Sequence, residues 1–127
     1  MDEAIRLEPQ HAPGYSNRGF AYGELGQYDW AIKDYDEAIR LRPQYVDAYE
    51  SRGRIYIRQG QDERAIQDLS QAIRLDPSFA SAFAIRALAN TLLGNDMEAQ
   101  RDVDRAVGLG GDRGILEGDI EELKKLR

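Results

Sequence analysis

The chain is rich in charged side chains but poor in the residue types that most often carry catalysis or bind metals. Its 127 residues include no cysteine and one histidine, which excludes thiol nucleophiles, disulfides, thiolate metal sites and histidine-rich metal sites. The histidine, His11, follows Pro9 in a predicted linker, and we interpret it as a loop residue. The carboxylates lie at helix spacing on solvent-facing positions, and no two of them stand out as an acid–base couple. We therefore expect no catalytic residue, no metal, no cofactor and no enzymatic activity.

The charge of the chain also restricts its partners. The formal net charge is −6, and no segment of the chain is basic, so the attraction to phosphates that drives nucleic-acid binding is missing. The same charge argues against an anionic membrane surface, and no apolar run approaches the roughly 20 residues that span a bilayer. No signal-peptide pattern is visible. We expect a soluble protein, with the cytoplasm as the favoured compartment, and a protein or peptide partner.

The sequence repeats itself with a period of 34 residues. Periods of this length are typical of helical repeat proteins. Three full units occupy residues 12–45, 46–79 and 80–113, preceded by residues 1–11 and followed by residues 114–127. Aligned columns of the three units are Tyr15, Tyr49 and Phe83; Gly19, Gly53 and Ala87; Gly26, Gly60 and Gly94; Ala31, Ala65 and Ala99; Tyr35, Leu69 and Val103; Ala38, Ala72 and Ala106.

Each unit is predicted to form two helices. In the second unit, apolar residues recur at spacings of three and four over 46–59 and again over 62–75. Gly60 follows the first helix, where a left-handed residue can end it. Asp62 is expected to cap the second helix through its carboxylate, and Pro77 is expected to stop it. Neither helix can bury its apolar face alone, so packing between helices must create the core.

Two further patterns concern how the helices pack. The small residues of the Gly19 and Ala31 columns are predicted to face each other and to let paired helices approach closely. An arginine column (Arg18, Arg52 and Arg86) recurs beside an aspartate column (Asp34, Asp68 and Asp102). The arginines could form an anion-binding ladder. The preferred interpretation is structural, with each arginine fork on a carboxylate of an adjoining helix.

The repeated unit resembles the tetratricopeptide repeat family. The residues that carry the resemblance in the first two units are Tyr15, Gly19, Tyr22, Ala31, Tyr35, Ala38 and Pro43, and Tyr49, Gly53, Tyr56, Ala65, Leu69, Ala72 and Pro77. The third unit departs from the pattern, with Asn90 in place of the tyrosine and Gly111 in place of the proline. The resemblance implies an all-α fold, a right-handed α-solenoid of antiparallel helix pairs in a single domain. It also implies a non-catalytic module whose concave groove binds an extended peptide or a partner helix.

The groove is expected to be lined by the first helix of each unit, with Glu24 and Ser51 among the residues on this face. The candidate peptide-binding residues are Asn17, Phe20, Glu50, Arg54, Ile57, Ala84, Leu88 and Thr91. Phe20 and Leu88 would supply apolar contacts, Asn17 would bind peptide backbone, and Arg54 would bind an acidic residue. The alternative is that Phe20 and Leu88 pack against neighbouring repeats and bind nothing.

Some family members bind the C-terminal carboxylate of heat-shock chaperones through lysine, asparagine and arginine side chains of consecutive first helices. Aligned with that pattern, this chain has Ser16 and Phe20, then Ser51, then Ser81 and Ile85. These side chains are uncharged, so we do not expect this chain to bind a chaperone tail in that way.

The two ends of the chain differ from the complete units. Residues 1–11 match the end of a second helix, with Ala4, Ile5 and Leu7 in apolar columns, so the chain is expected to be a fragment that begins inside an earlier repeat. That edge could make a homodimer, which is the alternative function, or the chain could be the targeting domain of a larger protein. Residues 114–127 are predicted to form a capping helix with Leu116, Ile120 and Leu123 on one face and a Glu121–Lys125 pair.

Overall fold

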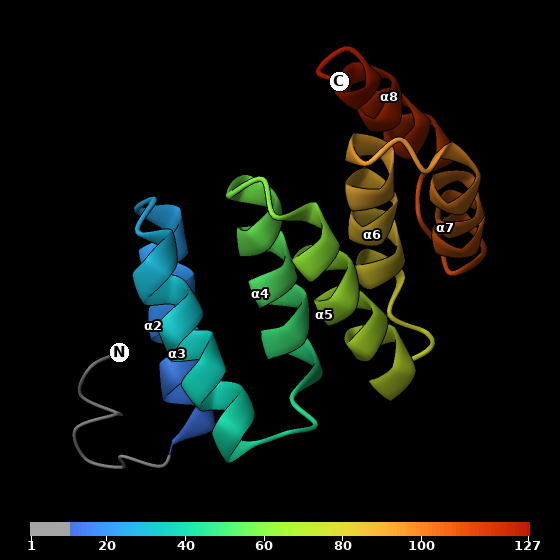
Figure 1. Cartoon of the computed structure of the whole chain (residues 1–127). Coiled ribbons are helices and arrows are strands. Elements are labelled where there is room, and N and C mark those ends of the chain that lie inside the picture. The colour runs from blue at the N-terminus through green and yellow to red at the C-terminus, as the bar shows by residue number, and fades with distance from the viewer. Residues whose placement is uncertain (1–10) are drawn as a thin grey trace.

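The structure, a computed structural model, describes residues 11–127. Within this range the chain forms seven helices and no strand: α2 (Ala12–Glu24), α3 (Tyr28–Leu41), α4 (Val46–Arg58), α5 (Asp62–Leu75), α6 (Ala80–Leu92), α7 (Asp96–Gly108) and α8 (Arg113–Lys124). Figure 1 shows them stacked in chain order, with α2 and α3 at one end of the molecule and α8 at the other. The predicted all-α helical repeat fold is confirmed. Ala4, Ile5 and Leu7 lie outside the described residues.

The helices pair as the 34-residue period predicts, and tight glycine turns join the two helices of each pair. In the second pair, Gly60 has a φ of +75°. Its N–H donates to the carbonyl of Ile57 at 2.9 Å, and the N–H of Gln61 donates to the carbonyl of Tyr56 at 2.8 Å. These two bonds satisfy carbonyls that the end of α4 would otherwise leave unpaired. Gly26 and Gly94 repeat the same backbone conformation, with φ values of +76° and +81°.

The predicted cap of α5 by Asp62 is wrong. Asp62 is the first residue of the helix, Gln61 occupies the capping position, and no side chain caps this end. The capping side chain normally belongs to the residue before the first helical one, where its oxygen accepts a hydrogen bond from an N–H group two or three residues further along. Asp62 Oδ1 is instead buried without a hydrogen-bond partner, and this burial, with the charge of Glu63 adding to it, raises the pKa of the carboxyl.

The small columns bring paired helices into close contact, as predicted. A Cβ added to Gly53 would lie 3.0 Å from Cγ of Leu69. The third pair has an extra methyl group at this position, Ala87, and the smaller Val103 in place of the leucine. Ala87 and Val103 are 1% and 0% exposed. The gain in volume on one helix is therefore matched by a loss on its partner, which keeps the core filled.

The last helix caps the final repeat. Ile120 of α8 is 8% exposed and packs with Ala87 and Val103, while Leu116 and Leu88 are partly buried against the same cluster. The helix thus covers apolar side chains of the last repeat.

The predicted ion pair on this helix is wrong. Glu121 contacts Lys124 at 3.2 Å, and Lys125 contacts Glu122 at 3.0 Å. Each of the two side chains pairs with a residue three positions away, so neither contacts the other.

Candidate functional site

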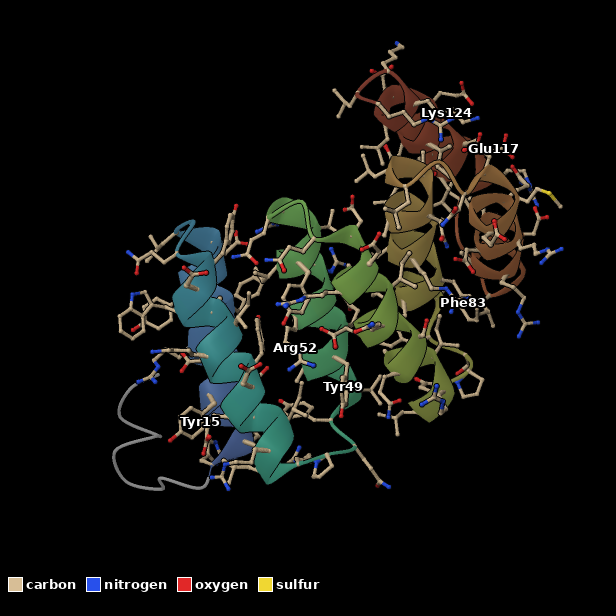
Figure 2. The ribbon with its side chains drawn as sticks, viewed as in Figure 1. Tyr15, Tyr49, Arg52, Phe83, Glu117 and Lys124 are labelled. Carbon is tan, nitrogen blue, oxygen red and sulfur yellow. The ribbon has the colours of Figure 1, made fainter. Side chains whose placement is uncertain are left out.

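The arginine column is part of the scaffold. Nε and Nη2 of each arginine donate to the two carboxylate oxygens of one aspartate on the paired helix. The bonds are 2.7–2.9 Å long, for Arg18 with Asp34, Arg52 with Asp68 and Arg86 with Asp102. Figure 2 shows Arg52 in the space between α3 and α4, where its Nη1 also donates to Asp36 of the preceding repeat at 2.8 Å. The structural interpretation of this column is confirmed, because the fork that an anion ladder would need is already occupied.

A pocket of about 330 Å³ opens between the first helices of two successive repeats. Its walls combine apolar and charged side chains of α2 and α4, with one tyrosine of α3. The lining residues are Phe20, Gly23, Glu24, Tyr35, Glu50, Ser51, Arg54, Ile55 and Arg58. Three of the predicted groove residues, Phe20, Glu50 and Arg54, therefore meet at one place.

Arg54 is held at the rim of this pocket by partners on two helices. Its Nε donates to the carboxylate of Glu50 on the preceding turn, and its Nη2 donates to Oγ of Ser81 on α6 at 3.0 Å. The Glu50 side chain is 12% exposed while the Arg54 side chain is 50% exposed. A guanidinium carries five N–H donors, so Arg54 retains donors that can reach an incoming carboxylate or carbonyl.

The rest of the pocket supplies an apolar surface and a second cation. Phe20 is 61% exposed, so its ring is open to contact with a ligand. Tyr35 also lines the pocket, and burial raises the pKa of its hydroxyl despite a hydrogen bond with Ser51, so the hydroxyl stays neutral at physiological pH. At the rim, Arg58 Nη1 lies 3.8 Å from a carboxylate oxygen of Glu24. A pocket that combines apolar surface with charged side chains suits a bound polypeptide that carries both kinds of group.

The other predicted residues are spread along the same face. Asn17 is exposed, while Ile57, Ala84 and Leu88 are partly buried. Ile57 packs against the core between α5 and α6, and Leu88 packs with the cluster that the capping helix covers.

The structure corrects the placement of Thr91. Its side chain is 0% exposed, and its Oγ1 donates to the carbonyl of Ala87 at 2.8 Å. Thr91 therefore does not belong to the site.

Four lining residues were missing from the predicted groove: Gly23, Tyr35, Ile55 and Arg58. Gly23 had a sequence signal, because its column carries Ile57 and Thr91 in the other two units. A glycine in a column of larger side chains leaves a hollow, and Ile55 of the next first helix fills part of it, with its Cδ1 2.8 Å from where a Cβ of Gly23 would be. The position of Arg58 depends on the offset between α2 and α4, which a period alone does not define.

Family models match most of the repeated region. A model described as tetratricopeptide repeat matches residues 12–45, another of the same description matches residues 34–67, and a model described as TPR repeat matches residues 53–94. The comparison with curated proteins returns no match.

Solved structures with the same architecture include both TPR domains of Spaghetti (RPAP3), each bound to the HSP90 peptide SRMEEVD. The second domain is 33% identical with a TM-score of 0.76, over 84% of this chain and 98% of that one. The first domain has a TM-score of 0.84 at 24% identity, over 92% and 93% of the two chains. The Arabidopsis OM64 TPR domain has a TM-score of 0.82 at 23% identity, over 91% and 96%. The likeness to the last two shows the fold alone.

None of the helices in the described part of the chain combines the length and the apolar character that crossing a membrane would require.

Proposed function

This chain belongs to the tetratricopeptide repeat family, and from that premise we propose that it is a non-catalytic interaction module that binds an extended peptide in the groove formed by α2, α4 and α6. The observation that carries the proposal is the pocket between α2 and α4, where an exposed Phe20 lies beside the anchored cation Arg54. The 33% identical second TPR domain of Spaghetti, bound to an HSP90 peptide, supports the same mode of use.

Each part of the pocket has a role in this proposal. Phe20 and Ile55 would pack against an apolar side chain of the ligand, and burial of such a side chain contributes most of the affinity at small interfaces. Arg54 and Arg58 would bind an acidic side chain one or two residues away. Asn17, further along α2, would hydrogen-bond to peptide backbone, while Glu50 holds Arg54 in place.

The ligand that fits this pocket is an internal peptide segment rather than a free C-terminus. The positions that would have to supply a carboxylate clamp carry uncharged side chains, among them Ser51, Ser81 and Ile85. Arg54 lies in the Phe20 column instead and is already paired with Glu50. A peptide segment with an apolar residue next to an acidic one would contact both Phe20 and Arg54.

We propose protein partners rather than nucleic acids, because the net charge of −6 provides no attraction to phosphates. The homodimer through Ala4, Ile5 and Leu7 stays a prediction, since these residues lie outside the described ones. The targeting role in a larger protein and the cytoplasmic location also stay predictions.

The test compares two exposed apolar residues on opposite sides of the molecule. A peptide selected on the protein from a random library is titrated by calorimetry against Phe20→Ala and against Met97→Ala, the latter on α7 and 70% exposed. We expect Phe20→Ala to weaken binding about tenfold, equivalent to about 1.4 kcal/mol, and Met97→Ala to leave it unchanged. Equal affinities for both variants, with unchanged thermal unfolding, would refute the groove assignment.

A further inference from the structure

A second pocket, separate from the groove, lies where α5, α6 and α7 meet. It has a volume of about 300 Å³ and is lined by Ile66, Arg86, Asn90, Glu98, Arg101 and Asp102. None of these residues takes part in the groove pocket. In the first two repeats, a tyrosine side chain fills the equivalent place.

In the first two repeats a tyrosine ring covers the scaffold arginine. The guanidinium carbon of Arg18 lies 5.9 Å from the ring centroid of Tyr22, and that of Arg52 lies 6.0 Å from the ring centroid of Tyr56. These distances are within the range in which a cation is attracted to the face of an aromatic ring. The tyrosine is thus a regular part of the repeat, packed on the arginine–aspartate pair.

A second side chain covers the outer side of each tyrosine. In the first repeat it is Trp30, whose ring centroid lies 6.1 Å from that of Tyr22. In the second it is Arg64, whose guanidinium lies 5.8 Å from the ring centroid of Tyr56. Trp30 and Arg64 occupy the same column of the 34-residue period, and the third member of that column is Glu98.

The third repeat keeps the surroundings of the ring and lacks the ring. Asn90 stands in the tyrosine column, and its short side chain lies against the scaffold, with Nδ2 donating to Asp102 at 3.1 Å. Arg86 still forms its fork with Asp102 and still has Phe83 at 5.6 Å, but its second aromatic neighbour is gone. The space left by the missing ring is the second pocket. Glu98 stands in the column of Trp30 and Arg64, which cover the tyrosine ring in the other two repeats.

We propose that this pocket binds a tyrosine side chain of a partner polypeptide, which takes the place that Tyr22 and Tyr56 occupy in the other repeats. The ring would lie over the guanidinium of Arg86 with one edge on Ile66. The hydroxyl would be close to Glu98 and Arg101, which can accept and donate a hydrogen bond respectively. The four charged groups of the lining, two of each sign, favour a neutral phenol over an anion or a cation.

The test uses N-acetyltyrosinamide as the probe and N-acetylleucinamide as its aliphatic control. Each is titrated into ¹⁵N-labelled protein to about 50 mM, well above the roughly millimolar Kd expected of a single side chain, while backbone and Asn90 amide signals are followed. We expect saturating shifts in α6 and α7 around Asn90 with the tyrosine probe and at least fivefold smaller shifts with the leucine probe. No saturating shift there, or equal shifts with both probes, would overturn the proposal.

A variant that restores the ring gives an independent readout. Asn90→Tyr should fill the pocket from within, raise the thermal unfolding midpoint and abolish the response to the probe. Gln44→Tyr adds the same ring at an exposed position between α3 and α4 and should leave the response intact. If Asn90→Tyr is folded and still binds the probe with unchanged affinity, the ligand does not occupy the tyrosine place. None of these outcomes depends on whether the groove binds a peptide.

Discussion

Arg52 on α4 and Asp68 on α5 form a two-bond fork, with Nε and Nη2 of the arginine donating to separate carboxylate oxygens at 2.8 and 2.7 Å. The side chains are 18% and 8% exposed. Burial alone would lower the pKa of Arg52, but the hydrogen bonds and the charge of Asp68 outweigh it and raise that pKa. The fork, together with the bond from Arg52 to Asp36, joins three helices of two repeats.

Replacing Arg52 should destabilise the fold and spare the groove. Arg52→Ala leaves Asp68 buried without its cation, and breaking a buried pair on one side costs about 3 kcal/mol. We expect a loss of that size in the free energy of unfolding by urea, with peptide affinity changed less than about twofold. A large loss of affinity with unchanged unfolding would instead assign the arginine to binding.

The control for this variant is an ion pair on the surface. Arg40 and Glu37 pair within α3, and the Arg40 side chain is 64% exposed. Surface pairs of this kind contribute little to stability, because solvent screens the charges and ordering the two side chains costs entropy. Arg40→Ala should therefore unfold nearly as the unaltered protein does.

Replacing glycine by alanine should lower the free energy of unfolding at Gly53 and raise it at Gly118. A Cβ at Gly53 would lie 3.0 Å from Cγ and 3.2 Å from Cδ2 of Leu69, whereas a Cβ at Gly118 in α8 would meet nothing within 4 Å. Gly53→Ala forces the core apart and should cost about 1–3 kcal/mol. Gly118→Ala removes a flexible residue from a helix and should stabilise by about 0.5–1 kcal/mol. Stabilisation by both variants in urea unfolding would mean that α4 and α5 are not in close contact.

The unpartnered carboxylate of Asp62 predicts a pH-dependent effect. Burial raises its pKa in the folded protein above the unfolded value, so the folded state binds the proton more readily. The charged form therefore lowers stability at neutral pH, and this penalty disappears as the pH falls through the folded-state pKa toward the unfolded one. Asp62→Asn should raise the Tm at pH 7 and lose this advantage at pH values below the unfolded pKa of about 3.9. An advantage that is the same at both pH values would contradict this assignment.

The repeat fold could be predicted from the sequence because each rule behind the prediction acts over a few residues. Gly60 ends α4 with a φ of +75°, and α5 spans Asp62–Leu75 as expected. The arginine–aspartate pairing followed from the period itself. The predicted cap by Asp62 was wrong because a cap depends on which single residue precedes the helix. Hydrophobic spacing does not define that residue.

The groove was less predictable than the fold. Phe20 and Arg54 line one pocket, and they lie on the face of the first helices that the sequence predicts to be opposite the paired helices. Thr91 was misplaced because its side chain is 0% exposed, and the spacing of residues within one helix does not define how deeply the third repeat buries it. The pocket between α2 and α4 depends on the offset between successive repeats, which side-chain packing at Gly23 and Ile55 adjusts.

The most direct test of the groove is to map a bound peptide onto the molecule by NMR. A peptide selected from a random library is added to ¹⁵N-labelled protein, and the chemical-shift changes are assigned to residues. We expect the largest changes on α2 and α4, around Phe20 and Arg54, with further changes at the start of α6. Changes confined to α3, α5 and α7, on the opposite side of the helix pairs, would contradict this expectation.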